Sequence, residues 1–138
     1  MKTQKNISSP KHNKGHETVL IAVTGISPAI ITETIWALAL QQEKPVIPSR
    51  IIAITTSRGK ERICSELFTP PEKSKISVWD SLCMALRKKN IETDGKLRFG
   101  CTGDDIRVMT KLNKKTGKSE EIDDIRTIED NESAADFI

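Results

Sequence analysis

Residues 18–42 read TVLIAVTGISPAIITETIWALALQQ, and the rest of the chain is organised around this stretch. An apolar run of strand length, Thr18 to Val23, leads into the turn Thr24–Pro28, and an apolar-rich helical pattern follows at once. In an open α/β sheet such a junction lies at the carboxyl end of a strand, where the unpaired N–H groups of the next helix attract anions. We therefore expect a ligand at this turn.

The helical pattern after the turn predicts a helix that is buried on most of its circumference, because apolar residues recur at spacings of three and four. Ser27 is placed to cap this helix, and Pro28 suits its first position. One face of the helix is expected to pack on a sheet and another on a further surface, such as a second subunit.

Residues 50–56, RIIAITT, are rich in β-branched side chains and predict a second strand of a parallel sheet that is covered on both faces. Ser57–Gly59 is expected to close this strand, and residues 60–68 show helical spacing. Two strands joined by a helix should be parallel, with a right-handed crossover. The expected fold class is therefore α/β, with a mostly parallel sheet flanked by helices.

The second half of the chain predicts smaller elements. We expect a third helix from Ser74 to Lys89 and a short strand over residues 96–101. The runs 106–109 and 119–125 flank a glycine turn and could form a small β-hairpin insertion. Thr127 is expected to cap a last helix that reaches Ile138 without a capping signal, which suggests a truncated chain.

The composition predicts one domain, since 138 residues suffice for a core, and a formal charge of +3 is weak evidence for a polyanion partner. Residues 1–16 hold lysines, no acid and little apolar surface, so they are expected to form a disordered basic arm ahead of a domain over residues 17–138. A solvated arm is favoured over one that touches nucleic acid. The apolar stretches are shorter than the ~20 residues that cross a bilayer, so no membrane span is expected.

The reactive side chains exclude several chemistries. Cys64, Cys83 and Cys101 are odd in number and widely spaced, so we expect reduced, structural cysteines in a cytoplasmic protein. Both histidines lie in the basic arm, and no Cys, His, Asp or Glu set has metal-ligand spacing, so neither a metal nor a cofactor is expected. The acids and amide at positions 123, 124, 130 and 131 are interpreted as a solvated helix start.

The turn Thr24–Pro28 holds one glycine, so it matches neither the dinucleotide-binding fingerprint nor the Walker A loop. Gly25, the Ser27 hydroxyl and the open helix end would together suit one phosphate, although a plain strand-to-helix turn without a ligand is the alternative. Thr56, Ser57 and Arg58 should lie beside this turn at the same sheet edge and could add donors for phosphate or ribose. The alternative for them is an ordinary solvated loop.

Three ordered segments carry a resemblance to a known family: LIAVTGISPAIITETIWALA, IIAITTSRGKER and DDIRTIEDNESAADFI. Together they are similar to the CRISPR-associated CARF-domain proteins of the ring-nuclease branch. The resemblance implies a Rossmann-like (CARF) sheet, a two-fold homodimer, and a cleft that binds cyclic tetra- or hexa-adenylate. It also implies metal-independent cleavage, in which a ribose 2′-hydroxyl attacks the neighbouring phosphate and leaves a 2′,3′-cyclic phosphate.

By this resemblance Ser27 would be catalytic, contacting the scissile phosphate or orienting the 2′-hydroxyl. The remaining ligand-binding residues would be those of the turn and of the second strand end: Thr24, Gly25, Ile26, Pro28, Thr56, Ser57 and Arg58. Similar family members continue past the last segment into a strand and a glycine-rich turn with Arg-Lys, and this chain ends before that point. A lysine of that turn assists the reaction in the family.

Three functions stay open. The chain could be a ring nuclease, a sensor or sponge that binds cyclic oligoadenylate without cutting it, or an unrelated α/β protein that binds another phosphate-bearing ligand. Neither a membrane nor DNA is expected as a partner. Binding and cleavage of labelled ligand would separate the three.

Overall fold

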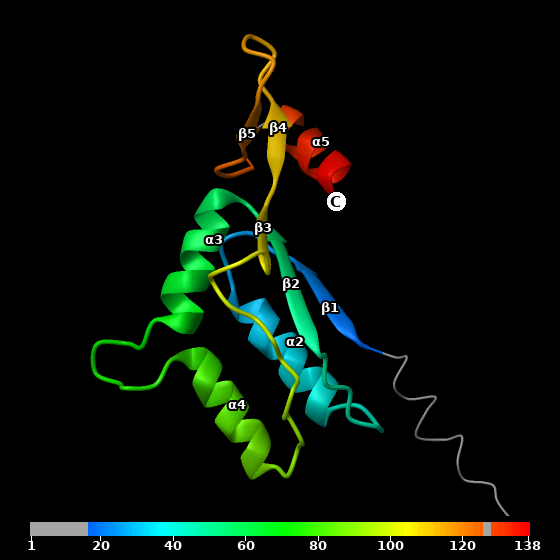
Figure 1. The fold of residues 1–138 in the computed structure, drawn as a ribbon, viewed down its shortest axis with the longest axis vertical. Helices are drawn as coiled ribbons and strands as arrows, with labels where there is room; N and C mark the ends of the chain where they lie inside the picture. The colour runs from blue at the N-terminus through cyan, green and yellow to red at the C-terminus, as the bar shows by residue number, and fades with distance from the viewer. Residues whose placement is uncertain (1–16, 126–127) are drawn as a thin grey trace, which may run out of the picture.

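Three parallel strands form the larger of the two sheets in a computed structural model of this protein, which describes residues 17–125 and 128–138. They are β1 (Val19–Val23), β2 (Arg50–Thr55) and β3 (Ile106–Val108), in the spatial order β1-β2-β3 (Figure 1). Helix α2 (Ala29–Leu40) joins β1 to β2. The expected α/β fold with a parallel sheet flanked by helices is confirmed. The expected arm 1–16 and the expected cap Thr127 lie outside the described residues.

One face of the sheet forms the main core. Successive strand residues point to opposite faces, so Ile51, Ala53 and Thr55 of β2 share one face, and all three are 0% exposed. Ile31 and Ile35 of α2 are buried in the same cluster. The helix thus packs on the sheet through Ile31, Ile35 and Ala39, whereas Ile30 is 51% exposed. The expected burial on most of its circumference is therefore not met within the described residues.

The other face of β1 is open within the described residues. Val19, Ile21 and Val23 alternate with the core-facing residues of β1 and are 40%, 60% and 51% exposed. The expectation of a sheet covered on both faces is therefore not met by the elements that the structure describes. The apolar pattern of a strand predicts that the strand is buried, but it does not show which elements cover each face.

Helix α3 (Ser57–Ile63) begins directly after β2 and continues as a π-helical turn, η1 (Cys64–Phe68). Ser57–Gly59 was expected to close the strand, and instead forms the first turn of this helix. The reason is a cap, since the Thr56 side chain accepts a hydrogen bond from the Gly59 N–H at 3.1 Å. The second candidate cluster is therefore a helix start and not a loop.

Helix α4 (Val78–Lys88) confirms the third expected helix but starts later than Ser74. The Ser74 hydroxyl accepts a hydrogen bond from the Ile76 N–H at 3.2 Å, which forms a local turn before the helix. Ser77 is the N-cap, and its hydroxyl accepts from the Asp80 N–H at 3.1 Å. Trp79 packs against Phe68 and Phe99, with ring centroids 5.6 and 5.3 Å away.

The strand expected over residues 96–101 is reduced to one isolated bridge between Arg98 and Arg50. Leu97 has a φ of 58°, a left-handed conformation that cannot continue an extended strand. The Leu97 N–H donates to the Pro48 carbonyl at 2.9 Å, so the segment is still held against the sheet.

The expectation of three reduced cysteines is wrong for two of them, because Cys64 and Cys101 form a disulfide. The odd number and the wide spacing of the three cysteines argue against a bridge, and the two that form it lie 37 residues apart. The fold overrides this spacing, since η1 and the segment before β3 lie side by side, with the two α carbons 5.8 Å apart. Cys83 is the free cysteine of the described residues.

A hairpin of β4 (Thr110–Leu112) and β5 (Ser119–Glu121) follows β3, and α5 (Ile128–Phe137) ends the described chain. The hairpin was expected, but its first strand is 110–112, because residues 106–108 pair with β2 instead. Met109, Ile122 and Ala134 form a second small core between the hairpin and α5. Figure 1 shows this unit beyond the carboxyl ends of β1 and β2, on the far side from α4.

Among residues 17–125 and 128–138, no helix combines the length and the apolar character needed to cross a membrane.

Candidate functional site

The turn after β1, Thr24–Pro28, is held by hydrogen bonds at its start. The Thr24 N–H donates to the Ile54 carbonyl at 3.0 Å, and the Thr24 hydroxyl donates to the Ser27 carbonyl at 3.2 Å. Ser27 was expected to cap α2, but Pro28 occupies the N-cap position and no side chain caps the helix. The Ile31 N–H donates to the Pro28 carbonyl at 3.0 Å, which makes the first turn tight. The helix therefore begins at Ala29.

Helix α3 lies directly against this turn. The Thr55 hydroxyl donates to the Gly25 carbonyl at 3.3 Å, and Gly59 approaches the same carbonyl from the first turn of α3. The sequence placed the two candidate clusters at one sheet edge, and the structure confirms that they meet there. The contact is made by backbone and by Thr55.

A cavity of about 430 Å³, here called the strand-end cavity, opens at the carboxyl ends of β1 and β2. One wall comes from the strand ends and the other from α5 and the segment before it. Its lining residues are Val23, Thr24, Gly25, Thr56, Met109, Asp124, Ile125, Asn131, Ala134, Ala135 and Ile138.

Three of the predicted site residues, Thr24, Gly25 and Thr56, line the strand-end cavity. Thr24 and Thr56 are only 8% and 2% exposed, and the oxygen of Thr56 already accepts the capping hydrogen bond from Gly59. These threonines therefore shape the cavity floor. Gly25 is exposed, so its backbone groups form a polar part of the cavity rim.

The other predicted residues do not line this cavity. Ser57 is turned toward Asp123, whose carboxylate accepts from the Ser57 hydroxyl at 3.0 Å, and Ser57 lines a separate cavity beside Lys60. Arg58 is exposed, and its backbone N–H donates to the Asp123 backbone carbonyl at 3.3 Å. In the turn, Ile26 and Ser27 are exposed and Pro28 is buried.

Helix α5 and the segment before it contribute no residue to the predicted site residues. Asp124 and Asn131, interpreted as part of a solvated helix start, line the strand-end cavity, and Asp130 is only 5% exposed. Asp130 forms an ion pair with Lys111 of β4, which fastens α5 to the hairpin. The signal in the sequence was the resemblance of residues 123–138, which marked this segment without giving its place in the fold.

The chemistry of the strand-end cavity follows from its lining. Its walls are mostly aliphatic, and its polar groups are two hydroxyls, one amide, one carboxylate and the Gly25 backbone. None of the residues listed above as lining it is a lysine, arginine or histidine. Such a cavity suits a flat base or a sugar better than a buried phosphate, because aliphatic walls pack against rings and an amide reads a base edge.

In the part of the chain that the structure describes, no three His, Cys, Asp or Glu side chains gather in a way that could hold a metal ion.

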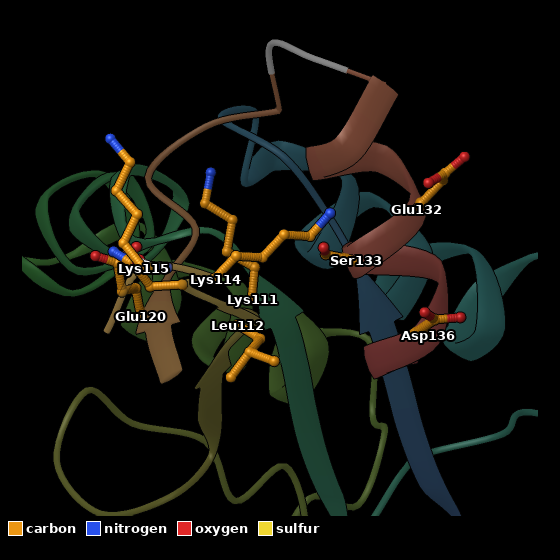
Figure 2. A pocket seen from close by; sticks show the side chains of 9 residues that line it. Lys111, Leu112, Lys114, Lys115, Glu120, Glu132, Ser133 and Asp136 are labelled. Carbon is orange, nitrogen blue, oxygen red and sulfur yellow. Dashed lines mark hydrogen bonds between the residues drawn. The ribbon is translucent and has the colours of Figure 1, made fainter. Parts of the chain in front are cut away.

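A second cavity, of about 510 Å³, lies between the β4–β5 hairpin and α5, and is here called the hairpin cleft. Figure 2 shows Lys111 reaching across it toward Ser133 of α5, with Lys114 and Lys115 on the hairpin side. The strand-end cavity and the hairpin cleft use different residues of α5, such as Asn131 for the first and Ser133 for the second.

Comparisons with protein-family models, with curated proteins and with solved structures gave no match to this chain.

Proposed function

We propose that this chain binds cyclic oligoadenylate at the strand-end cavity and that its family uses this site to cleave the ring. The single observation that carries the proposal is the joining of Thr24, Gly25 and Thr56 in one cavity with Asn131 of α5. All three segments that carry the family resemblance contribute to this lining. The proposal includes a Rossmann-like fold and a two-fold homodimer, with one cleft shared by two copies.

In this proposal the cavity receives one adenosine and the phosphates remain at its mouth. The aliphatic side chains of Val23 and Ala134 would pack on the base, and the Asn131 amide would pair with its edge, since an amide can bond both N6 and N7 of adenine. The phosphate would lie over Gly25 and Ser27, outside the carboxylate-bearing interior. Gly25 has no atom within 4 Å of the place where a Cβ would lie, so its backbone can be approached closely.

Cleavage would need little from the protein beyond positioning. The ribose 2′-hydroxyl attacks the adjacent phosphorus, the bond to the 5′-oxygen breaks, and the products carry a 2′,3′-cyclic phosphate and a 5′-hydroxyl. Ser27 would orient the attacking hydroxyl or donate to a phosphate oxygen, which is a positioning and electrostatic role. Its exposed place at the turn leaves the side chain accessible for that role.

A second function, binding without cleavage, is favoured by one observation. The described residues that line the strand-end cavity include no cation and no imidazole, so charge that develops in a transition state there would meet no positively charged side chain of the lining. A sensor or sponge needs the cavity alone. A third function, binding of another phosphate-bearing ligand in an unrelated α/β protein, predicts the same cavity without a preference for adenosine.

The experiment is incubation of the purified chain with labelled cyclic tetra- and hexa-adenylate in EDTA, following both binding and products. Cleavage that persists in EDTA and is lost in Ser27→Ala, but not in the matched control Ser81→Ala on α4, supports the nuclease. Binding without products supports the sensor, and Asn131→Ala should then weaken it. No binding by the folded chain would overturn both functions and leave the third.

A further inference from the structure

Strand β1 lies at an edge of the parallel sheet, although its sequence is typical of an interior strand. It reads VLIAV, an apolar run of five residues without a charge, a proline or a glycine. It pairs with β2 on one side, and no strand of the described residues lies on its other side (Figure 1). Edge strands are usually protected by charges, prolines or bulges, so this unprotected edge can accept a further strand.

The backbone groups of every second residue of β1 face this edge. At the start of the strand the Thr18 carbonyl accepts from the Ser49 N–H at 2.7 Å, and at its end the Thr24 N–H donates to the Ile54 carbonyl at 3.0 Å. Residues with even numbers therefore turn their N–H and carbonyl groups toward β2, because these groups alternate in direction along a strand. The odd-numbered residues of β1 turn theirs toward the edge.

One register lets a second, antiparallel copy of β1 use these groups. When Ile21 lies opposite its own counterpart, Val19 lies opposite Val23 of the other copy. These three residues are the ones whose backbone groups face the edge, so each opposing pair can exchange two hydrogen bonds. On the inner face, Leu20 lies opposite Ala22, which sets a large side chain against a small one. The strand is therefore complementary to itself in this register.

The exposed side chains fit the same register. Val19, Ile21 and Val23 are 40%, 60% and 51% exposed, and they form a row, Val-Ile-Val, that reads the same in both directions. Apolar side chains that lie directly opposite each other on one face of an antiparallel pair stabilise the pairing. Just before the strand, Glu17 would lie opposite Gly25, so no like charges meet within residues 17–25.

Helix α2 adds apolar surface beside this edge. Ile30 is 51% exposed and Trp36 is half-buried, and Glu33 is the one charged residue of the helix. The buried side of α2 packs in the same core as Leu20 and Ala22, so the helix lies on the inner face of β1. In a joined sheet the two copies of α2 would share that face, about two strand spacings or roughly 10 Å apart. Packed helices lie about 8–10 Å apart, so each α2 could pack against its copy.

We propose that β1 pairs in antiparallel orientation with β1 of a second copy, which joins two three-stranded sheets around a two-fold axis at Ile21. The contact is closed, because it uses the same edge of each copy. A second copy is favoured over an unrelated strand because β1 is complementary to itself in register, charge and size. The pairing places the two strand-end cavities at opposite ends of the joined sheet. It is therefore independent of the proposed function, whose shared cleft would need another surface of the chain.

The experiment measures the mass of the full chain by sedimentation velocity over a concentration series. The test variants are Ile21→Lys and Ile21→Glu, and the matched control is Leu112→Lys on β4, where the leucine is 64% exposed. Each variant is studied alone, and the two Ile21 variants are also mixed in equal amounts. Circular dichroism checks that every variant is folded.

The unchanged chain should form a dimer. Ile21→Lys and Ile21→Glu should each raise the dissociation constant of this dimer by at least about tenfold, because two like charges would meet at the axis. The mixture of the two variants should dimerise again, since the charges that meet then have opposite sign. Leu112→Lys should leave the dimer intact.

A chain that stays monomeric at every concentration would overturn the proposal and leave the edge to residues 1–16 or to a strand of another protein. A dimer that persists in both Ile21 variants would place the interface elsewhere on the chain. A mixture that fails to associate would contradict the two-fold axis at Ile21. Equal loss in Leu112→Lys, or growth beyond the dimer, would indicate unspecific association and would also overturn the proposal.

Discussion

Gly59, at the start of α3, lies so close to the carbonyl oxygen of Gly25, in the turn after β1, that a Cβ on Gly59 would lie 2.6 Å from it. The same Cβ would also collide with the Thr55 side chain. This contact joins the two predicted site segments through backbone atoms. Only glycine at position 59 permits the approach.

Gly59→Ala should therefore destabilise the protein by about 1–3 kcal/mol, the usual cost of forcing an extra carbon into a packed site. The change should also displace the turn and weaken any ligand bound at Gly25. Chemical denaturation measures the first effect and ligand titration the second. Gly100→Ala is the matched control, since no atom lies within 4 Å of its Cβ position, and equal losses in both variants would contradict the packing argument.

The ion pair between Lys111 and Asp130 should fasten α5 to the hairpin. The Asp130 side chain is 6% exposed and that of Lys111 is 38% exposed, so the attraction is only partly screened. We expect a coupling free energy of about 1–2 kcal/mol from a double-mutant cycle of Lys111→Met and Asp130→Asn. Loss of the pair should also loosen the strand-end cavity. A coupling near zero would show that packing alone holds α5.

Reduction of the Cys64–Cys101 disulfide should lower the free energy of unfolding. A bridge that closes 37 residues limits the unfolded chain, and the chain-entropy estimate for that length is about 4 kcal/mol. Guanidinium unfolding with and without reductant measures the change. Cys64→Ser should reproduce it and make the protein insensitive to reductant. An unchanged midpoint in both experiments would argue that the thiols are unbridged in solution.

Cys83 should react slowly with alkylating reagents. Burial raises the pKa of its thiol, Asp80 raises it further, and Arg87 opposes the shift. Because the thiolate is the nucleophile, the alkylation rate should rise with pH around a midpoint above that of an ordinary cysteine. Iodoacetamide labelling followed by mass spectrometry gives this curve. Arg87→Gln should move the midpoint higher still, and a midpoint below the ordinary value would contradict the burial argument.

Arg58→Ala should weaken binding of an anionic ligand more at low salt than at high salt. Its exposed side chain does not line the strand-end cavity, so its attraction would act through solvent and would be screened. Titration at two ionic strengths measures the difference. An equal loss at both ionic strengths would count against an electrostatic contact between Arg58 and a phosphate of the ligand.

Local rules predicted the framework of this fold well. Residues 18–42 specified a strand, a turn and an apolar helix, and residues 50–56 specified the partner strand, because strand length and helical spacing are written in neighbouring residues. They also placed Thr24, Gly25 and Thr56 at one edge, since parallel strands share their carboxyl ends. Caps were less predictable, as Ser27 leaves α2 uncapped while Thr56 starts α3.

By itself, then, the sequence determined the parallel strand pair, its connecting helix and the glycine turn, all of which depend on short-range patterns. Only the tertiary structure decided the Cys64–Cys101 bridge, the place of α5 beside the turn, and the two cavities on either side of it. These features depend on contacts between distant segments. They form when whole faces of distant elements pack together, and the spacing of neighbouring residues does not predict that packing. The turn Thr24–Pro28 was found from sequence, but its opposite wall was found only in the fold.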